Sequence, residues 1–450
     1  MNYIGKYKIC GLLGRGGMSK VYKVEIPVIE KIVALKLLDP DPLLVDLIGM
    51  KKIRELFISE AAKLASLRHP NIVEIWNFDH FDGKHFYLMD YYFNNLGIMI
   101  GETRWTEQPS RLIKLEKAID WTRQILTGLA CLHHAGIIHQ DIKPFNLLLT
   151  EQEVVKICDF GLSKLRGETI STPSNLKVGS AWYASPEQED DPERVDFRAD
   201  LFSTGITLYR MLTGQIPAGS PDAPSRHNPD LDADWDKFMM QSIDPDPEKR
   251  FSSAKDMLAQ LEVLEKKWQE KMQLACRVTQ LDEDNFKPAN SRLLELRKDS
   301  VKIASRNARN FFSLDDLWRP LNYISNNFQA NPDSSLTDLT TGLTWQQAGS
   351  EYPLTWQQAK SFIRALNQQH YAGRTNWRLP TVNELISLLT EAPHAEHLCI
   401  EPVFDARQTA FWSSDRKSYT AAWYVSVDLG FVHWQDFSAC YYVKAVSDTC

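Results

Sequence analysis

The sequence lacks the features that would place it in a membrane or outside the cell. No uninterrupted apolar run approaches the roughly 18 residues that a membrane-spanning helix needs. The N-terminal stretch contains no apolar core of a signal peptide. The 7 cysteines are an odd number without the paired C-x-x-C spacing of a zinc site, which indicates reduced thiols. These absences predict a cytoplasmic protein without a membrane span.

The sequence also has no excess of positive charge. The chain has 51 Lys and Arg against 58 Asp and Glu, a formal net charge of −7, and a pI of about 5.9. It lacks the global basic field of a dedicated nucleic-acid binder, so we do not expect nucleic acid as a partner. With 21 Gly and 22 Pro in 450 residues, low-complexity and collagen-like chains are excluded. The length predicts two or three domains.

Three regions differ in charge and composition. Residues 1–265 carry 31 basic and 38 acidic residues, residues 266–329 carry 12 and 8, and residues 330–450 carry 8 and 12. The last region holds 6 of the 13 Trp, which is typical of a compact domain rich in strands and turns. We therefore predict a first domain over 1–265, a basic helical linker over 266–329 and a second domain over 330–450.

The predicted linker has apolar residues at helical spacing over Trp268–Leu281 and Leu293–Ile303. Five basic side chains form its predicted polar face: Arg297, Lys298, Lys302, Arg306 and Arg309. Two uses of this face remain open, which are docking on the acidic first domain and binding of nucleic acid or acidic lipid.

The first domain begins with strand patterns and continues with helical ones. Alternating residues predict strands over Tyr7–Leu13, Val21–Ile26, Ile32–Leu38 and Phe86–Tyr91. Helical spacing predicts a helix over Ile53–Leu67 and further helices over 115–135, 199–213, 232–243 and 252–268. A small sheet before a larger helical half predicts an α+β fold with a cleft between two lobes, residues 1–90 and 91–265.

Glycines occupy the turn between the first two predicted strands, in the run Gly14–Val21. Because glycine has no Cβ, the backbone N–H groups of such a turn can approach phosphate oxygens closely. Lys36 lies on the third strand, and Glu60 follows 24 residues later on the predicted helix. We expect Lys36 and Glu60 to pair in the cleft. A plain tight turn and two solvated charges are the alternative.

Two further motifs follow in order. The run Ile138–Asn146 contains Asp141 and Lys143, and Asp159 begins an Asp-Phe-Gly triplet 18 residues after Asp141. This series of motifs resembles the protein kinase family. The resemblance implies a two-lobed protein-kinase fold, ATP and Mg²⁺ as cofactors, and phosphoryl transfer to a hydroxyl of a protein substrate.

The resemblance also implies roles for individual residues. Asp141 would accept or orient the proton of the substrate hydroxyl, and Lys143 would neutralise the transferring phosphoryl group. Lys36, held by Glu60, would position the α- and β-phosphates, while Asn146 and Asp159 would hold Mg²⁺. The other ATP-binding residues would be Leu13, Gly14, Gly16, Gly17, Val21, Ala34, Met89, Tyr91 and Leu148. In this set, Val21, Ala34 and Leu148 would enclose the adenine, and Met89–Tyr91 would be the hinge.

Other positions refine the resemblance. Lys143, two residues after Asp141, and Ser180 in the loop before Glu187 favour serine/threonine specificity. The run Leu13–Met18, together with His69–Ile72, is most similar to bacterial serine/threonine kinases. Hydroxyls after the Asp-Phe-Gly triplet are candidate autophosphorylation sites, with plain solvation as the alternative.

Two expectations concern structure. The family pattern implies that Glu187 pairs with Arg250 and that Asp200 fixes the backbone of the catalytic loop. Glu187, Arg250 and Asp200 are therefore expected to have structural roles and to take no part in the reaction itself.

Two departures from the family pattern carry information. Ser19 replaces the third glycine of the loop, so we expect altered loop mobility with ATP binding retained. Gln140 stands where the family has an arginine that grips an activation-loop phosphate. A neutral amide cannot form that bidentate pair, which puts control by activation-loop phosphorylation in doubt.

The last region has its own motifs. A strand, turn and strand are predicted over Thr337–Trp345, a helix over Trp356–Gln368, and a second helix capped by Thr381 with Glu384 three residues later. Strands follow over Phe411–Asp415, Ala422–Gly430 and Tyr441–Val446. The runs Trp377–Thr381 and Phe411–Ser414 resemble the Lcl C-terminal domain family over about 336–446, which implies a C-type-lectin-like α+β fold.

We expect this second domain to bind a ligand or protein partner, because it has no supported reactive cysteine pair. Candidate surface residues are Tyr419, Trp423, Tyr424, His433, Trp434, Tyr441 and Tyr442, with core packing as the alternative for each. The complete chain is thus predicted to be an ATP-dependent serine/threonine protein kinase with a recognition domain. The alternative is a lectin-like ligand-binding protein, with a fold that retroelements diversify in related proteins, whose kinase domain is regulatory or a scaffold.

Overall fold

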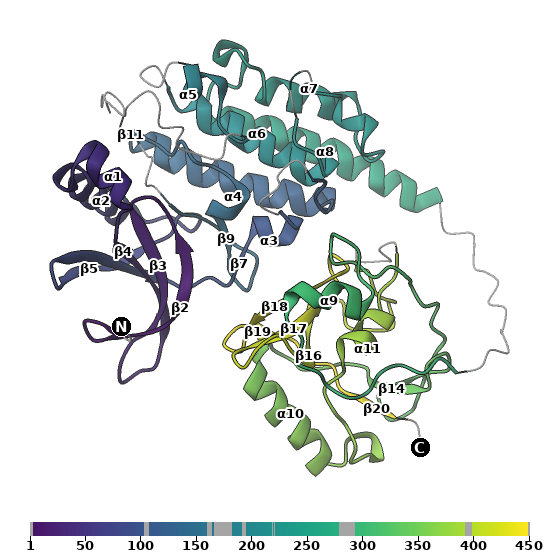
Figure 1. The fold of residues 1–450 in the computed structure, drawn as a ribbon. Helices are drawn as coiled ribbons and strands as arrows, with labels where there is room; N and C mark the ends of the chain where they lie inside the picture. The colour runs from purple at the N-terminus through teal and green to yellow at the C-terminus, as the bar shows by residue number, and fades with distance from the viewer. Residues whose placement is uncertain are drawn as a thin grey trace. The chain divides into compact units, whose positions relative to one another are not determined.

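A computed structural model describes residues 3–102, 108–159, 164–165, 182–190, 195–217, 219, 221–278, 293–391 and 398–448. The chain divides into two compact units, Met1–Leu281 and Asp282–Cys450 (Figure 1). We call them the first unit and the second unit and describe each by itself.

The first unit begins with an antiparallel sheet in the order β1-β2-β3-β4-β6-β5. Its strands are β1 (Tyr3–Ile4), β2 (Tyr7–Arg15), β3 (Ser19–Glu25), β4 (Ile32–Leu38), β5 (Ile75–Phe81) and β6 (Lys84–Asp90), and its helices are α1 (Pro42–Ile48) and α2 (Met50–Ala65). Helix α2 packs Phe57 against Tyr87 of β6, with ring centroids 5.4 Å apart. This contact fixes α2 on one face of the sheet.

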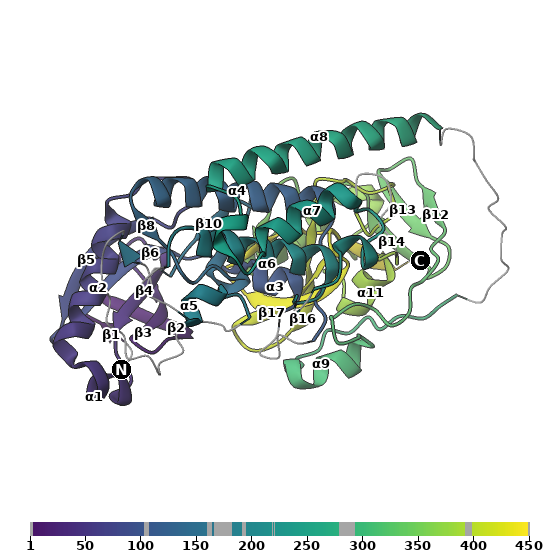
Figure 2. The same cartoon turned by 90° about the horizontal axis from the view of Figure 1, so that it is seen from above.

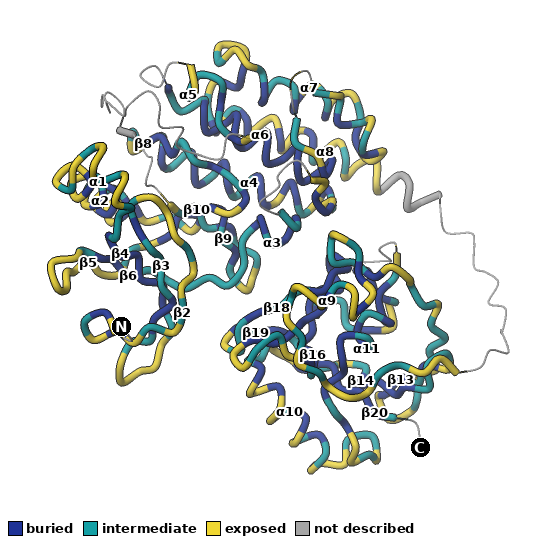
Figure 3. The backbone as a smooth tube through the Cα atoms, viewed as in Figure 1, coloured by how far each residue is buried: buried dark blue, intermediate teal, exposed yellow. Residues whose placement is uncertain are grey.

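The rest of the first unit is mainly helical. Its helices are α3 (Leu96–Ile100), α4 (Leu115–His134), α5 (Pro186–Asp190), α6 (Arg198–Thr213), α7 (Ala233–Ser242) and α8 (Ala254–Val278), and its short strands are β7 (Asn94–Asn95), β8 (Ile137–Ile138), β9 (Leu147–Leu149), β10 (Val155–Ile157) and β11 (Lys164–Leu165). Helix α6 is buried from Ala199 to Thr213 (Figure 3). Figure 2 shows α8 running along α4. The predicted α+β fold with two lobes is confirmed.

The second unit is also α+β. Its strands are β12 (Phe328–Ala330), β13 (Ser335–Asp338), β14 (Leu343–Gln346), β15 (Leu354–Thr355), β16 (Ala410–Arg416), β17 (Ala421–Ser426), β18 (Phe431–Asp436), β19 (Cys440–Tyr441) and β20 (Val446–Asp448), and its helices are α9 (Ser305–Phe312), α10 (Trp356–Gln368) and α11 (Val382–Ser387). The sheets follow the orders β12-β13-β14-β20, β15-β19 and β16-β17-β18. The predicted helix over Trp356–Gln368 and the capping box of Thr381 with Glu384 are confirmed. The C-type-lectin-like character stays a prediction.

The structure divides the chain differently from the predicted linker boundaries. Residues 266–278 continue α8, whereas residues 293–329 belong to the second unit. The helix predicted over Leu293–Ile303 is wrong, because that segment is extended and packs Leu296, Val301 and Ile303 against the core of the second unit. Its extended path lets Arg297 and the backbone N–H of Val301 reach the fully buried carboxylate of Asp415.

Three of the five residues of the predicted basic face form ion pairs within the second unit. Arg297 pairs with Asp415, Lys298 with Asp448, and Arg309 with Asp316.

The aromatic residues of the second unit separate into core and surface. Trp423, Tyr424 and Tyr441 are buried, and the rings of Tyr424 and Tyr441 stack with centroids 4.1 Å apart. Tyr419 is 76% exposed. Trp434 and Tyr442 are partly buried against the core, so core packing holds for five of the seven predicted residues.

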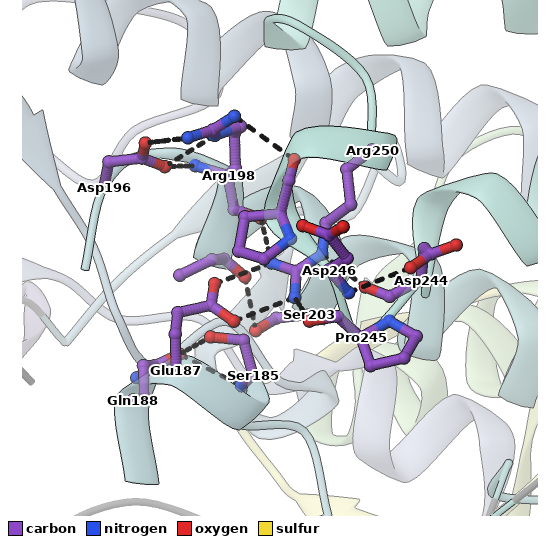
Figure 4. A network of polar contacts seen from close by, with 12 residues as sticks. Ser185, Glu187, Gln188, Asp196, Arg198, Ser203, Asp244, Pro245, Asp246 and Arg250 are labelled. Atoms are coloured by element: carbon purple, nitrogen blue, oxygen red, sulfur yellow. Dashed lines mark hydrogen bonds and ion pairs between the residues drawn. The ribbon is translucent and has the colours of Figure 1, made fainter. Parts of the chain in front are cut away.

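A buried ion pair joins α5 to the segment before α8 (Figure 4). The Arg250 guanidinium donates to both carboxylate oxygens of Glu187, at 2.6 and 2.8 Å. It also donates to the backbone oxygens of Asp244, Pro245 and Arg198. The predicted pairing of Glu187 with Arg250 is confirmed.

Replacing Arg250 with Met should destabilise the first unit by about 3–5 kcal/mol, because Glu187 and three carbonyl groups lose a buried donor. Thermal and urea unfolding of the full chain would measure this loss. Arg226→Met is the matched control, since the ion pair of Arg226 with Asp222 is exposed and such pairs contribute about 0–1 kcal/mol. Equal losses in the two variants would contradict the prediction.

A lysine lies in the core of the second unit. Lys444 is fully buried, and its Nζ donates to the backbone oxygen of Gln347 at 2.8 Å. The Nζ lies 4.7 and 5.2 Å from the ring centroids of Phe404 and Phe411. Burial lowers the pKa of Lys444 to about 7, with the charge of Asp405 partly opposing this shift.

This shift predicts a pH-dependent stability. Between pH 7 and the ordinary lysine pKa of 10.5, the unfolded chain binds a proton that the folded chain does not. The free energy of unfolding of the second unit should therefore rise with pH across this window, by up to about 1.4 kcal/mol per pH unit. Denaturation of the full chain at pH 7, 8 and 9 would measure the slope. Lys444→Met should remove this contribution, and an identical slope in both proteins would refute it.

Candidate functional site

Three side chains from different elements meet at Lys36 of β4. The Lys36 Nζ lies 2.6 Å from Glu60 Oε1 on α2 and 2.9 Å from Asp159 Oδ1, just after β10. Tyr87 of β6 donates its hydroxyl to Glu60 Oε1 at 2.8 Å. Lys36, Glu60 and Tyr87 are all buried. The structure thus brings together the Lys36 and Glu60 pair expected from the sequence.

The charges of this group shift one another. Although burial alone would lower it, the carboxylates of Asp159 and Glu60 raise the pKa of Lys36 well above its usual value. The charge of Lys36 lowers the pKa of Asp159 to about 2, against the effect of burial. Lys36 is therefore a permanent cation and Asp159 a permanent anion at neutral pH.

The catalytic-loop residues form a second group. Lys143 Nζ donates to both oxygens of Asp141, at 2.9 and 2.7 Å. Asn146 Nδ2 donates to the backbone oxygen and to Oδ2 of Asp141, each at 2.8 Å. Burial raises the pKa of Asp141, while the nearby Lys143 partly opposes the shift. The loop thus holds a partly buried carboxylate in one orientation.

Asp200 of α6 fixes the backbone of this loop by hydrogen bonds. Its carboxylate accepts the backbone N–H groups of His139 and Gln140 at 2.9 and 2.8 Å, and lies 2.8 Å from His133 Nε2. Burial alone would raise its pKa, but these hydrogen bonds and the nearby histidines lower the pKa of Asp200. The structural role expected for Asp200 is confirmed.

The glycine loop lies between β2 and β3. A Cβ built on Gly14 would meet no atom within 4 Å, and on Gly16 or Gly17 it would meet only ordinary contacts at 3.8 and 3.9 Å. None of the three has the positive φ that requires glycine. Neither packing nor backbone conformation therefore explains these glycines. Close approach of a ligand to the backbone would explain them.

The remaining residues predicted to bind ATP line the same part of the first unit. Ala34 pairs with Met89 across β4 and β6, and Val21 pairs with Lys36 across β3 and β4. Leu13 is 44% exposed at an irregularity of β2, Tyr91 follows β6, and Leu148 lies on β9. Val21, Tyr91 and Leu148 are only partly buried, so their side chains remain accessible.

The side-chain oxygens of Asp159 and Asn146 suit a hard divalent cation. Asp159 Oδ2 and Asn146 Oδ1 accept no hydrogen bond from the residues that the structure describes. In those same residues no cluster of three or more His, Cys, Asp and Glu forms a metal site. A metal ion held by Asp159 and Asn146 would take its other ligands from phosphate and water, as Mg²⁺ does.

Sequence reasoning missed Tyr87 and His133. The pairing of Tyr87 with Lys36 across β4 and β6 could have indicated the first, since cross-strand neighbours on one face are close. His133 had no sequence signal, because its partner Asp200 is 67 residues away. Phe160, Gly161, Ser180 and the candidate phosphorylation sites before it lie outside the described residues.

Two family models match the chain. The protein kinase domain matches residues 7–277, and the Lcl C-terminal domain matches residues 334–447. None of the helices in the described ranges combines the length and apolar character needed to cross a membrane.

Curated relatives match the first unit. A protein of Clostridium perfringens named as a probable serine/threonine-protein kinase is 31% identical over 58% of this chain and 38% of its own length. The serine/threonine-protein kinase PrkC of Bacillus subtilis is 30% identical over 57% of this chain and 40% of its own length. The chain thus spans about two fifths of the length of these relatives.

Among solved structures, the PknI kinase domain of Mycobacterium tuberculosis aligns with a TM-score of 0.45 and 25% identity. The alignment covers 58% of this chain and 96% of that one. The kinase family model covers well over half of the residues, and both predicted resemblances are confirmed by the matches. This chain belongs to the protein kinase family and carries an Lcl C-terminal domain behind its kinase domain.

Proposed function

We propose that the chain is an active serine/threonine protein kinase that acts in the cytoplasm. The observation that carries the proposal is the simultaneous contact of Lys36 with Glu60 and Asp159. In protein kinases the lysine of this strand and the glutamate of this helix must pair, and the metal-binding aspartate must be in place, before transfer occurs. Among the described residues, none of the five cysteines forms a disulfide, which suits a reducing compartment.

Asp141 and Lys143 are the proposed catalytic residues. Asp141 would accept a hydrogen bond from the substrate hydroxyl and orient its oxygen toward the phosphoryl group. Lys143, already 2.7 Å from Asp141, would turn one donor toward the transferring group and offset its charge. Because Asn146 holds Asp141 by two hydrogen bonds, the carboxylate needs little reorganisation.

ATP with Mg²⁺ would supply the phosphoryl group and the counter-charge for its phosphates. The open glycine loop leaves room for the phosphates against its backbone N–H groups, and Lys36 provides a buried cation. Within the described ranges, no hydrogen bond occupies Asn146 Oδ1 or Asp159 Oδ2, so both oxygens would serve the metal. Protein serine and threonine hydroxyls are the proposed substrates, and the second unit is the proposed recognition domain.

Asp141→Asn should lower the rate of phosphoryl transfer about 100- to 10,000-fold, because the amide cannot accept the hydroxyl proton. Transfer of labelled phosphate from ATP to casein and to the chain itself would measure the rate. Asp79→Asn is the matched control, since Asp79 lies exposed on β5. If the native chain binds ATP but transfers no phosphate, the scaffold alternative holds instead.

Activity should not depend on activation-loop phosphate. Gln140 directs its backbone N–H to Asp200 and its backbone oxygen to Gln188, and its neutral side chain cannot form a charge-assisted pair with phosphate. Treating the purified chain with a protein phosphatase, then removing the phosphatase, should leave the initial rate within about twofold. A tenfold loss of rate would overturn this expectation.

A further inference from the structure

Four exposed cations gather around the turn between β16 and β17 of the second unit. Arg416 ends β16, and Lys302 forms a parallel bridge with it, supported by the Ile303 N–H to Arg416 oxygen bond of 2.9 Å. Lys302 Nζ lies 3.8 Å from the ring centroid of Tyr419, at the tip of the turn. Lys360 and Arg364 are exposed one helical turn apart on α10. We call Lys302, Lys360, Arg364 and Arg416 the basic turn cluster.

Packing fixes α10 next to the turn. The Trp356 indole donates to the backbone oxygen of Ser413 on β16 at 2.9 Å. The Trp356 ring stacks on Phe437 with centroids 4.3 Å apart, and the Phe437 N–H donates to the backbone oxygen of Thr420 in the turn. Lys360 Nζ lies 3.5 Å from the Trp356 ring centroid. The two halves of the cluster therefore belong to one rigid surface.

The cluster has no internal counter-charge. Among the residues that the structure describes, no carboxylate forms an ion pair with any of its four members, although Arg297, Lys298 and Arg378 of the same unit each have one. Asp415, which directly precedes Arg416 in the sequence, is fully buried and already paired with Arg297.

The bridge between Lys302 and Arg416, and the single helical turn between Lys360 and Arg364, place the charges of each pair close together. Burial, together with the charges of Arg416 and Arg364, lowers the pKa of Lys360. The adjacent Lys302 and Arg416 lower the pKa of Tyr419. A bound anion would relieve this repulsion and satisfy the free donors.

We propose that the basic turn cluster binds a phosphorylated peptide, with the phosphate between Arg364, Arg416 and the two lysines. A phosphoserine or phosphothreonine carries a charge of about −1.5 to −2 and three strong acceptor oxygens, which matches a compact set of unpaired arginines and lysines. Tyr419, with its ring 76% exposed at the tip of the turn, offers an apolar face to a neighbouring peptide side chain.

The observations favour a compact anion over a long polyanion. The cluster is confined to one turn, one helix face and one strand-like segment. The whole second unit has 16 basic and 19 acidic residues, so its net charge does not attract nucleic acid over long distances. A single phosphate on a peptide needs only the local field.

The inference rests on the proposed function in one respect only, which is the source of the ligand. If the first unit phosphorylates protein hydroxyls, then phosphorylated segments of substrates, or of the chain itself, are its products and are available as ligands. In the catalytic loop, Gln140 stands where the family has a phosphate-binding arginine. The basic turn cluster would instead bind phosphate on the second unit.

The test is a binding measurement on the full chain without ATP, so it does not depend on kinase activity. The probes are a fluorescent alanine-glycine peptide with one phosphothreonine and its unphosphorylated twin, followed by fluorescence polarisation. We expect the phosphorylated peptide to bind at least tenfold more tightly. Arg416→Gln and Arg364→Gln should each weaken its binding at least fivefold, while Arg416→Lys should weaken it less, because it keeps the charge and loses the planar fork.

Arg407→Gln is the matched control, because Arg407 is an exposed arginine of the same unit whose partner is Asp405. It should leave binding unchanged, and circular dichroism would verify that all variants are folded. Equal binding of the two peptides, unchanged binding by the Arg416 and Arg364 variants, or tighter binding of a single-stranded RNA or of phosphatidylglycerol vesicles would each overturn the proposal. Casein phosphorylation by the same preparation distinguishes a failure of this site from a failure of the kinase.

Discussion

The first unit depends on one buried cation. Taking the ammonium of Lys36 out of water costs several kcal/mol unless carboxylates compensate it, and those carboxylates come from α2 and from the segment after β10. Helix α2 must therefore dock on the sheet, and the helical lobe must present Asp159, for the charge to be stable. Tyr87 contributes to both requirements, because it packs on Phe57 of α2 and donates to Glu60. Sheet, helix and loop are thus assembled around a single electrostatic requirement.

Buried carboxylates organise backbone elsewhere in the chain in the same way. Asp200 accepts two N–H groups of the catalytic loop, and Asp415 accepts the N–H groups of Val301 and Val382 besides the Arg297 guanidinium. A carboxylate has about four acceptor positions, so one buried side chain can hold several segments that lack regular secondary structure. The catalytic loop and the segment 293–303 are both ordered by such a contact.

Local patterns in the sequence predicted much of this structure. The capping box at Thr381 and the helix over Trp356–Gln368 depend on neighbours along the chain, and the structure agrees with them. The pair of Lys36 and Glu60 was expected from the kinase-like order of the motifs, and the structure contains it. The extended course of 293–303 could not be predicted, because its cause, Asp415, lies more than a hundred residues away. Strand β5 was missed for a related reason: most of its residues are exposed, so it lacks the alternation that marks a half-buried strand. The final predicted strand is interrupted between β19 and β20, where Tyr442 hydrogen-bonds to β16 instead.

The attachment of segment 293–303 also bears on modularity. Leu296, Val301 and Ile303 pack against the core of the second unit, and Arg297 neutralises the fully buried carboxylate of Asp415. The portable module therefore includes the segment from Leu294 onward, upstream of the stretch 334–447 that defines the Lcl C-terminal domain by sequence. A recombination event or gene fusion that cut the chain at residue 330 would remove Arg297 and the Val301 N–H, the partners of Asp415. Exchange of this C-terminal domain between kinases has to carry the preceding segment with it.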